Sequence, residues 1–278
     1  MPVHHLLILA LIQGITEFLP VSSSGHLVLV HTGLNGDAAG GYTQDRMLDV
    51  AVHAGTLIAA LVYFRRDIHA MLGYVRRMGR GESDDFGRRL LACIMIASLP
   101  VIIAGFTLYV AQPAWLRSLE IVAWTTLVFG IVLWLCDRYA PGNKGLETLT
   151  WRGALVIGVA QALALIPGTS RSGITMSAGR ALGFARTEAA RFSMLLAIVA
   201  ISGASVLSGL DLLQSGNYRL GLDMMLAAFM AAIAGWVAIA LLMRWLARAS
   251  FTPFVIYRIL LGGGLLVLIY GGYLPAHL

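Results

Sequence analysis

Long apolar runs fill most of the chain, and short polar clusters interrupt two of them. A membrane-spanning helix needs about 20 predominantly apolar residues. Six runs meet or approach this length, at about 48–64, 90–111, 118–136, 189–210, 222–243 and 254–274. The pattern therefore predicts an all-α polytopic membrane protein in which these six runs are transmembrane helices.

Two further apolar regions, residues 4–33 and 152–182, contain the interruptions "EFLPVSSSGH" and "IPGTSRSG". Pro20 and Pro167 cannot continue a helix, and the flanking arms are too short to cross a hydrocarbon core about 30 Å thick. Non-helical backbone at membrane depth persists only where protein or a water-filled cavity satisfies it. We therefore expect two re-entrant helical hairpins whose tips line one polar cavity.

Composition and charge agree with a membrane protein and suggest its orientation. Only 12% of the residues are charged, whereas about 25% would be charged in a soluble domain. The net charge of +6 would suit nucleic acid, but basic residues in a membrane protein more often mark cytoplasmic loops. If both hairpins return to the face that they entered, fifteen Lys and Arg residues share one side. That side is then cytoplasmic, both termini are periplasmic, and no nucleic-acid partner is expected.

The order of segments is hairpin, three spans, hairpin, three spans. Because three is odd, the second half starts from the opposite membrane face. We therefore expect one integral membrane domain, 1–278, built from two inverted-topology repeats at about 1–136 and 152–274. The sequences "QGITEFLPVSSSG" and "QALALIPGTSRSG" align Gln13 with Gln161, Ser22 with Ser170, Ser24 with Ser172 and Gly25 with Gly173. Such repeats bind ligands near the bilayer midplane, where the two breaks meet.

The polar residues of the two breaks suit a phosphate or diphosphate. A helix N-terminus that carries hydroxyl groups is a ready anion site, and the planar guanidinium of Arg171 can grip phosphate oxygens in pairs. The hydroxyl groups expected to line this pocket belong to Ser22, Ser24, Ser170, Ser172 and Thr175. A packing role is the alternative for any single serine, but an intramembrane arginine is functional by default.

Gln13 and Glu17 are four residues apart and share one helical face. A carboxylate beside a phosphate pocket would repel the ligand unless a cation lay between them. Mg²⁺ and Ca²⁺ prefer oxygen ligands and commonly bridge a carboxylate to substrate phosphates. We therefore predict a divalent cation, Mg²⁺ or Ca²⁺, at Glu17, with Gln13 as a weaker ligand.

Three kinds of residue complete the candidate chemistry. His26 suits general acid–base catalysis near neutral pH, and one of the three serines at 22–24 could act as a nucleophile. A hydrogen-bonded core position is the alternative for a single histidine. His53, in the first predicted span, could also face the cavity. Arg258 lies early in the last predicted helix, and we expect its side chain to snorkel towards the cytoplasmic interface.

These residues resemble the signatures of a known family, the bacterial undecaprenyl-diphosphate phosphatases linked to bacitracin resistance. The first signature covers Gln13, Glu17 and "FLPVSSSGH" at 18–26, and the second covers "PGTSRSGIT" at 167–175. The likeness extends to "HAGTLIAAL" and "PFVIYRILLGG", and so to nearly the whole chain. The resemblance implies an inner-membrane hydrolase that removes the terminal phosphate of a C55 isoprenoid diphosphate at a periplasm-facing site. It also implies a divalent cation and reuse of the lipid carrier in peptidoglycan synthesis.

The resemblance also assigns roles to individual residues. Glu17 and Gln13 would hold the metal, Ser23 would be the leading candidate for the nucleophile, and His26 would be a base or a phosphate ligand. Arg171, between Ser170 and Ser172, would bind the diphosphate. A lipid transporter or flippase is the alternative, because inverted repeats with a midplane site are a transporter design. The sequence does not fix the oligomeric state, and a homodimer is one alternative.

Overall fold

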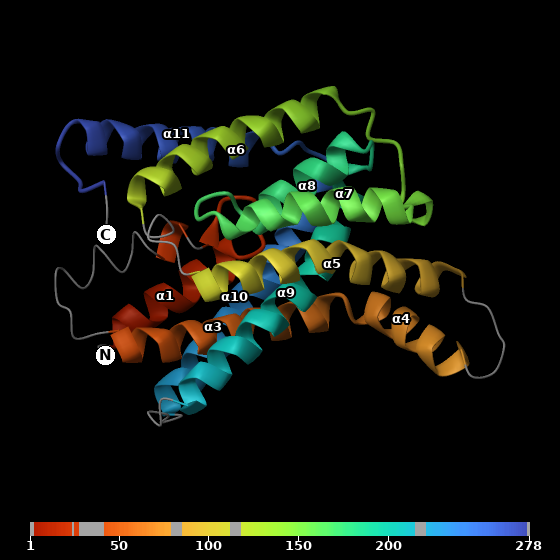
Figure 1. The fold of residues 1–278 in the computed structure, drawn as a ribbon, viewed down its shortest axis with the longest axis horizontal. Coiled ribbons are helices and arrows are strands. Elements are labelled where there is room, and N and C mark those ends of the chain that lie inside the picture. The colour runs from red at the N-terminus through yellow and green to blue at the C-terminus, as the bar shows by residue number, and fades with distance from the viewer. Residues whose placement is uncertain are drawn as a thin grey trace.

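The computed structural model describes residues 3–23, 25–27, 42–78, 85–111, 118–214 and 221–276. In these residues, helices joined by short connections form the chain (Figure 1). Five of the described helices are long and apolar enough to span a membrane. They are α5 (Asp85–Ala111), α6 (Leu119–Tyr139), α9 (Arg186–Gln214), α10 (Leu222–Leu246) and α11 (Thr252–Tyr270). They correspond to five of the six predicted runs, which confirms an all-α, multi-pass membrane protein.

The sixth predicted run forms a helix that is followed by a sharp bend and a second helix. Helix α3 (Tyr42–Tyr63) is followed by α4 (Arg65–Met78), and the two are bent by 75° where they meet. The sequence suggested a loop after residue 64. In α4, however, Ile68, Met71, Leu72 and Val75 fall three or four residues apart and form one apolar stripe. An amphipathic helix with basic residues at both ends is typical of a membrane surface.

The two interrupted regions contain short helices, as predicted. Helices α1 (Val3–Thr16) and α7 (Trp151–Ala162) have 14 and 12 residues. At 1.5 Å per residue they are about 21 and 18 Å long, too short to cross the hydrocarbon core. A one-turn 3₁₀ helix follows α7, and α8 (Arg171–Ala181) forms the second arm of the second hairpin. The second arm of the first hairpin lies outside the described residues beyond Leu27.

The first arm of each hairpin packs against a helix of the other half of the chain. Helix α1 lies against α10, and α7 lies against α5 (Figure 1). Small residues allow these backbones to approach closely. A Cβ atom on Gly158 of α7 would lie only 2.5 Å from the carbonyl oxygen of Ala97 on α5. The two halves are therefore interlocked and share one core.

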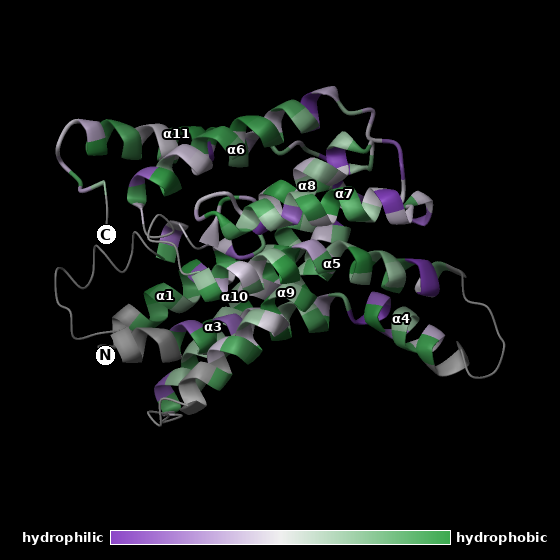
Figure 2. Ribbon diagram, in the orientation of Figure 1, coloured by the Kyte–Doolittle hydropathy of each residue, from purple (hydrophilic) through white to green (hydrophobic). Residues whose placement is uncertain are grey.

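Hydrophilic residues gather at one end of the molecule. Helix α4, the start of α5 and the connection between α6 and α7 lie at that end, opposite the start of α1 (Figure 1). Hydrophilic colour concentrates in the same segments (Figure 2). By contrast, α5 exposes Ile103, Phe106 and Val110, each at least 66% exposed. An apolar exterior between polar ends is what a lipid environment requires.

A buried ionic cluster lies at the hydrophilic end of the molecule. The carboxylate of Asp137, in the last turn of α6, accepts hydrogen bonds from Arg180 (2.9 Å) and Arg186 (2.8 Å). Arg180 also donates to the backbone carbonyl groups of Asp137 and Phe184. The backbone N–H of Phe251 points to the same carboxylate at 3.4 Å. This cluster ties the end of α6 to α8, α9 and the residue before α11.

Candidate active site

The two helix breaks share an unusual backbone conformation. Ser22 and Ser170 have φ values of 74° and 71°, and among the described residues they are the only non-glycine residues with positive φ. The Ser22 hydroxyl accepts a hydrogen bond from the Gly25 N–H (3.3 Å), and the Ser170 hydroxyl accepts one from the Gly173 N–H (3.1 Å). Both serines therefore cap the helical turn that follows them. The aligned residues of the two breaks adopt the same local geometry.

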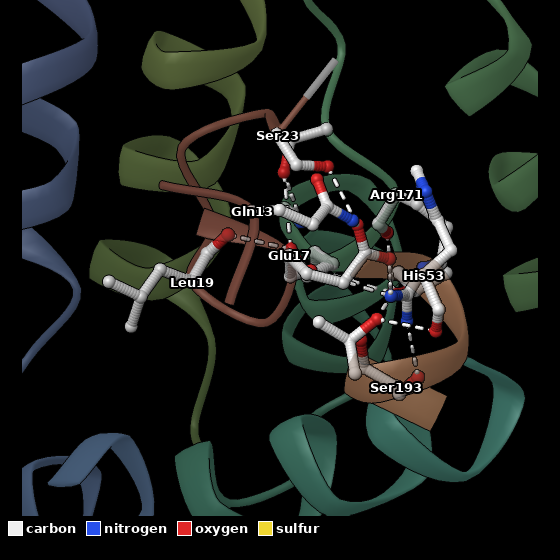
Figure 3. Close-up of polar contacts among 12 residues, drawn as sticks. Gln13, Glu17, Leu19, Ser23, His53, Arg171 and Ser193 are labelled. Atoms are coloured by element: carbon white, nitrogen blue, oxygen red, sulfur yellow. Dashed lines mark hydrogen bonds and ion pairs between the residues drawn. The ribbon is translucent and has the colours of Figure 1, made fainter. Parts of the chain in front are cut away.

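Glu17 lies at the centre of a polar cluster that joins the two breaks (Figure 3). Its Oε2 atom accepts hydrogen bonds from the Ser23 hydroxyl (2.7 Å) and from Gln13 Nε2 (2.9 Å). Its Oε1 atom forms an ion pair with Arg171 Nη2 at 3.0 Å. The side chains of Glu17 and Arg171 are only 9% and 14% exposed. The structure therefore brings together four of the site residues predicted from sequence.

Arg171 is held on two sides. It is the first residue of α8, and its Nη1 atom donates to the carbonyl oxygen of Ser193 on α9 (3.1 Å), while Nη2 faces Glu17. A buried ion pair is costly unless its remaining hydrogen bonds are satisfied, and here the Ser193 carbonyl meets part of that demand. The guanidinium is therefore held next to Glu17, whose other carboxylate oxygen accepts from the Ser23 hydroxyl. Ser193 was not among the residues predicted from sequence.

The remaining predicted hydroxyls hold the backbone of the breaks together. Ser172 Oγ donates to the Leu19 carbonyl (2.8 Å) and lies 3.2 Å from Ser170 Oγ. Thr175 Oγ1 donates to the Arg171 carbonyl (2.8 Å) and shares a hydrogen bond with Ser193 Oγ (2.7 Å). These side chains are buried. Ser24, which was predicted to line the same pocket, lies outside the described residues.

Both ring nitrogens of His26 have hydrogen-bond partners. Nδ1 lies 2.6 Å from the Ser22 carbonyl oxygen, which can only accept, so Nδ1 carries the hydrogen. Nε2 lies within hydrogen-bonding distance of the Tyr257 hydroxyl on α11, and the two rings are stacked at 5.6 Å between centroids. The proton of the tyrosine hydroxyl therefore points to Nε2. Tyr257 was missed at the sequence level, because it is 231 residues away.

His53 of α3 lies at the same cluster. Figure 3 places it beside Glu17 and Arg171. Its Nδ1 atom bonds to the Asp49 carbonyl oxygen at 2.7 Å, so the hydrogen again belongs to Nδ1. The sequence suggested that this histidine could face the cavity, and the structure agrees.

The expectation for Arg258 was wrong. Its side chain does not snorkel to an interface but is completely buried, at 0% exposure. Its guanidinium donates to backbone carbonyl groups that the two helix breaks and α6 present, including that of Pro20. These acceptors satisfy the charge inside the protein, so no exit to water is needed. The available signal was that an arginine inside an apolar helix is functional by default.

The residues around Glu17 fit a divalent cation only in part. Among the described residues, no three His, Cys, Asp or Glu side chains lie together as a metal cage. However, Gln13 Oε1 is buried and has no hydrogen-bond partner within the described part of the structure, while the Nε2 atom of the same amide bonds to Glu17. This oxygen is a free ligand next to a carboxylate. Such a pair suits a cation that takes its remaining ligands from substrate phosphates and water.

The fold and the site define a polytopic membrane protein with a serine, a carboxylate and an arginine at the meeting point of two helix breaks. The profile of the family described as "Bacitracin resistance protein BacA" matches residues 6–264, and the chain belongs to this family.

Relatives of similar length support this assignment. The "Undecaprenyl-diphosphatase" of Dinoroseobacter shibae is 43% identical over 271 residues, covering 97% of this chain and 100% of the relative. That of Ruegeria pomeroyi is 44% identical over 273 residues, covering 97% and 100%. "Undecaprenyl-diphosphatase 1" of Rhodospirillum rubrum is 45% identical over 269 residues, covering 96% and 95%. The similarity therefore spans both helix breaks.

Proposed function

We propose that this protein hydrolyses undecaprenyl diphosphate to undecaprenyl phosphate and inorganic phosphate. This activity would recycle the lipid carrier for peptidoglycan synthesis and confer bacitracin resistance. The observation that carries the proposal is the cluster in which Ser23 and Arg171, from different breaks, both bond to Glu17. The names of the relatives support the same activity. We place the protein in the bacterial inner membrane with a periplasm-facing site.

The serine–carboxylate pair supplies a nucleophile with its base. The Ser23 hydroxyl already donates to Glu17 Oε2, so Glu17 can take the proton as Ser23 Oγ attacks the terminal phosphorus. The Oγ–P bond forms, the bond from phosphorus to the bridging oxygen breaks, and undecaprenyl phosphate leaves with the electron pair. Water then hydrolyses the phosphoserine and releases phosphate. In the alternative, Glu17 activates a water that attacks phosphorus directly.

Arg171 and the N-terminus of α8 would stabilise negative charge on the transferring phosphoryl group. Arg171 Nη2 faces Glu17, and a phosphate entering beside Ser23 would share this guanidinium. The cap at Ser170 holds the first N–H groups of α8 in place. His26 would bind phosphate once Nε2 is protonated, because Nε2 would then donate to a phosphate oxygen instead of accepting from Tyr257.

A divalent cation would be held by Glu17 and the free Oε1 atom of Gln13. Once bound, it would offset the charge of the diphosphate next to the carboxylate. Because position 13 carries an amide and not a second carboxylate, the cation would depend more strongly on the substrate phosphates.

The activity can be tested by phosphate release from C55 diphosphate by the purified protein in detergent. We expect release in the presence of Mg²⁺ or Ca²⁺, loss of release after addition of a chelator, and recovery when the cation is restored. Absence of release under all cation conditions would contradict the proposed function. Phosphate release that persists in excess chelator would contradict the need for a divalent cation but not the phosphatase activity.

Ser23→Ala is expected to lower kcat by at least about 100-fold, because it removes the nucleophile and the hydrogen bond to Glu17. Acid quenching of the wild-type reaction with labelled substrate should trap phosphoserine at position 23. Ser177→Ala is a matched control, since Ser177 is a buried serine that bonds to the Gly173 carbonyl within α8. Full activity in Ser23→Ala would exclude serine attack and leave direct attack by water.

We also propose that the two halves are inverted-topology repeats. The shared conformation of Ser22 and Ser170 supports this, as does the exchange of first arms between halves. The transporter alternative is not favoured, because the relatives named above are diphosphatases. A homodimer remains a prediction, which the protein mass within the detergent complex would test.

A further inference from the structure

Arg258 is a buried cation whose partners are all neutral in the described part of the chain. Among the residues whose burial the structure describes, it is the largest fully buried side chain. Its hydrogen bonds, from Nε, Nη1 and Nη2, all go to backbone carbonyl oxygens. The acceptors are Thr126 (3.0 Å), Pro20 (3.3 Å), Thr125 (3.3 Å), Gly168 (3.1 Å) and Thr169 (3.0 Å).

These carbonyl groups come from three separate elements. Pro20 belongs to the break of the first hairpin, and Gly168 and Thr169 belong to the break of the second. A break frees carbonyl groups from helical hydrogen bonding, and at membrane depth they need other donors. One guanidinium supplies such donors to both breaks at once. Because Thr169 is two residues before Arg171, this contact fixes the start of the catalytic part of α8.

Helix α6 completes the arrangement. Thr125 Oγ1 donates to the Pro167 carbonyl (2.5 Å), and Thr126 Oγ1 donates to the Gly168 carbonyl (3.3 Å). Gly130, one turn further along α6, leaves room for the arginine: a Cβ atom there would lie 2.9 Å from Arg258 Cβ. Helix α6 therefore accommodates the Arg258 side chain at Gly130 and uses its two threonines to bond to the second break.

We propose that Arg258 is a positioning residue that clamps the two hairpin tips together without touching the substrate. Because the first tip carries Ser23 and Glu17 and the second carries Arg171, their relative placement decides whether the reacting groups meet. A misplacement of about 1 Å can cost about 100-fold in rate. This inference rests on the proposed phosphatase activity, but its effect on the tips can be measured without it.

Arginine is suited to this role by shape as well as by charge. Its planar guanidinium offers five N–H donors in a fixed fork, whereas lysine offers three on a compact ammonium. Arg258→Lys therefore keeps the charge and loses the fork, and Arg258→Met loses both. Arg180→Lys is the matched control, since Arg180 is also buried (3% exposed) but bonds to Asp137. It lies nine residues after Arg171 on α8, about 14 Å along the helix axis.

The experiment compares kcat, KM and peptide hydrogen exchange for the wild type and these three variants, each purified in detergent. We expect Arg258→Met to lower kcat of the folded protein by about 100-fold and Arg258→Lys by at least about 10-fold. KM should change less than about 3-fold, because Arg258 makes no contact with substrate. Peptides covering residues 18–23 and 166–172 should exchange faster in both variants and not in Arg180→Lys.

Any other outcome would contradict the proposal that Arg258 holds the two hairpin tips together. A raised KM with unchanged kcat would mean that Arg258 contacts substrate. Full activity in Arg258→Lys would mean that charge alone suffices. Unchanged exchange at the two tips, or the same pattern of losses in Arg180→Lys, would reduce the role to general stability. If the wild type releases no phosphate, the proposed function fails, and the exchange data still decide whether Arg258 holds the tips.

Discussion

Glu17→Gln is expected to lower kcat by at least about 1,000-fold, the largest effect of any single conservative change in this protein. The substitution keeps the shape of the side chain but removes its charge. It thereby removes the proposed base for Ser23 and the ion-pair partner of Arg171, which would contribute separately to the same step. The measurement is phosphate release from C55 diphosphate by purified protein. Glu120→Gln, which changes a carboxylate bonded to Tyr270 at the start of α6, should retain wild-type turnover.

The same change should also reduce stability. Removing one partner of a buried ion pair leaves the other charge uncompensated, at a cost of about 3–5 kcal/mol. Thermal unfolding of Glu17→Gln in detergent should therefore begin at a lower temperature than for the wild type. Retention of more than about a tenth of wild-type activity would mean that the carboxylate of Glu17 is neither the base nor the metal ligand.

Arg171→Ala is the second large effect, and we expect a loss of about 1,000-fold in kcat/KM. In the proposed mechanism this guanidinium, which is paired with Glu17, stabilises the charge that develops on the phosphoryl group, and such arginines contribute about 10³-fold or more. Arg171→Lys keeps the charge but cannot contact Glu17 and the Ser193 carbonyl with the same planar geometry. It should therefore recover only a small part of the loss, in the same phosphate-release assay.

A double variant separates catalysis from stability. Glu17→Gln with Arg171→Met removes both charges, so neither member of this ion pair is left without its partner in the protein interior. We expect its unfolding temperature to exceed that of Glu17→Gln alone, while its activity stays at the level of the single variants. Recovery of activity in the double variant would show that the single losses arise from misfolding, and the assigned roles would then be wrong.

Much of the architecture was predictable because the bilayer sets it. Apolar length identified α5, α6, α9, α10 and α11 to within a few residues at most ends, since each must cross the same thickness. The end of the first span at residue 64 was also predicted, but a loop was expected where α4 follows. Neither Pro nor Gly marks the bend at Phe64, so its angle was not predictable.

In the candidate site too, some contacts were predictable from the sequence and others were not. The meeting of Glu17 and Arg171 was predictable, because both flank breaks that must share one polar interior. The environments of His26 and Arg258 were not, because they depend on contacts made across more than 200 residues of sequence. The local sequence around His26 and His53 does not indicate which of them will have hydrogen-bond partners at both ring nitrogens. That depended on the placement of Tyr257 on α11.

The exchange of first arms between the halves has a consequence for biosynthesis. Helix α7 emerges from the ribosome after its partner α5, so it can dock at once. Helix α1 is made first but packs against α10, which begins about 200 residues later. At about 5–20 residues per second, the first hairpin waits roughly 10–40 seconds for the surface that buries it. For about three quarters of that interval its carboxylate also lacks Arg171, which follows Glu17 by 154 residues. We therefore expect the early chain to need the insertion machinery to shelter a polar tip.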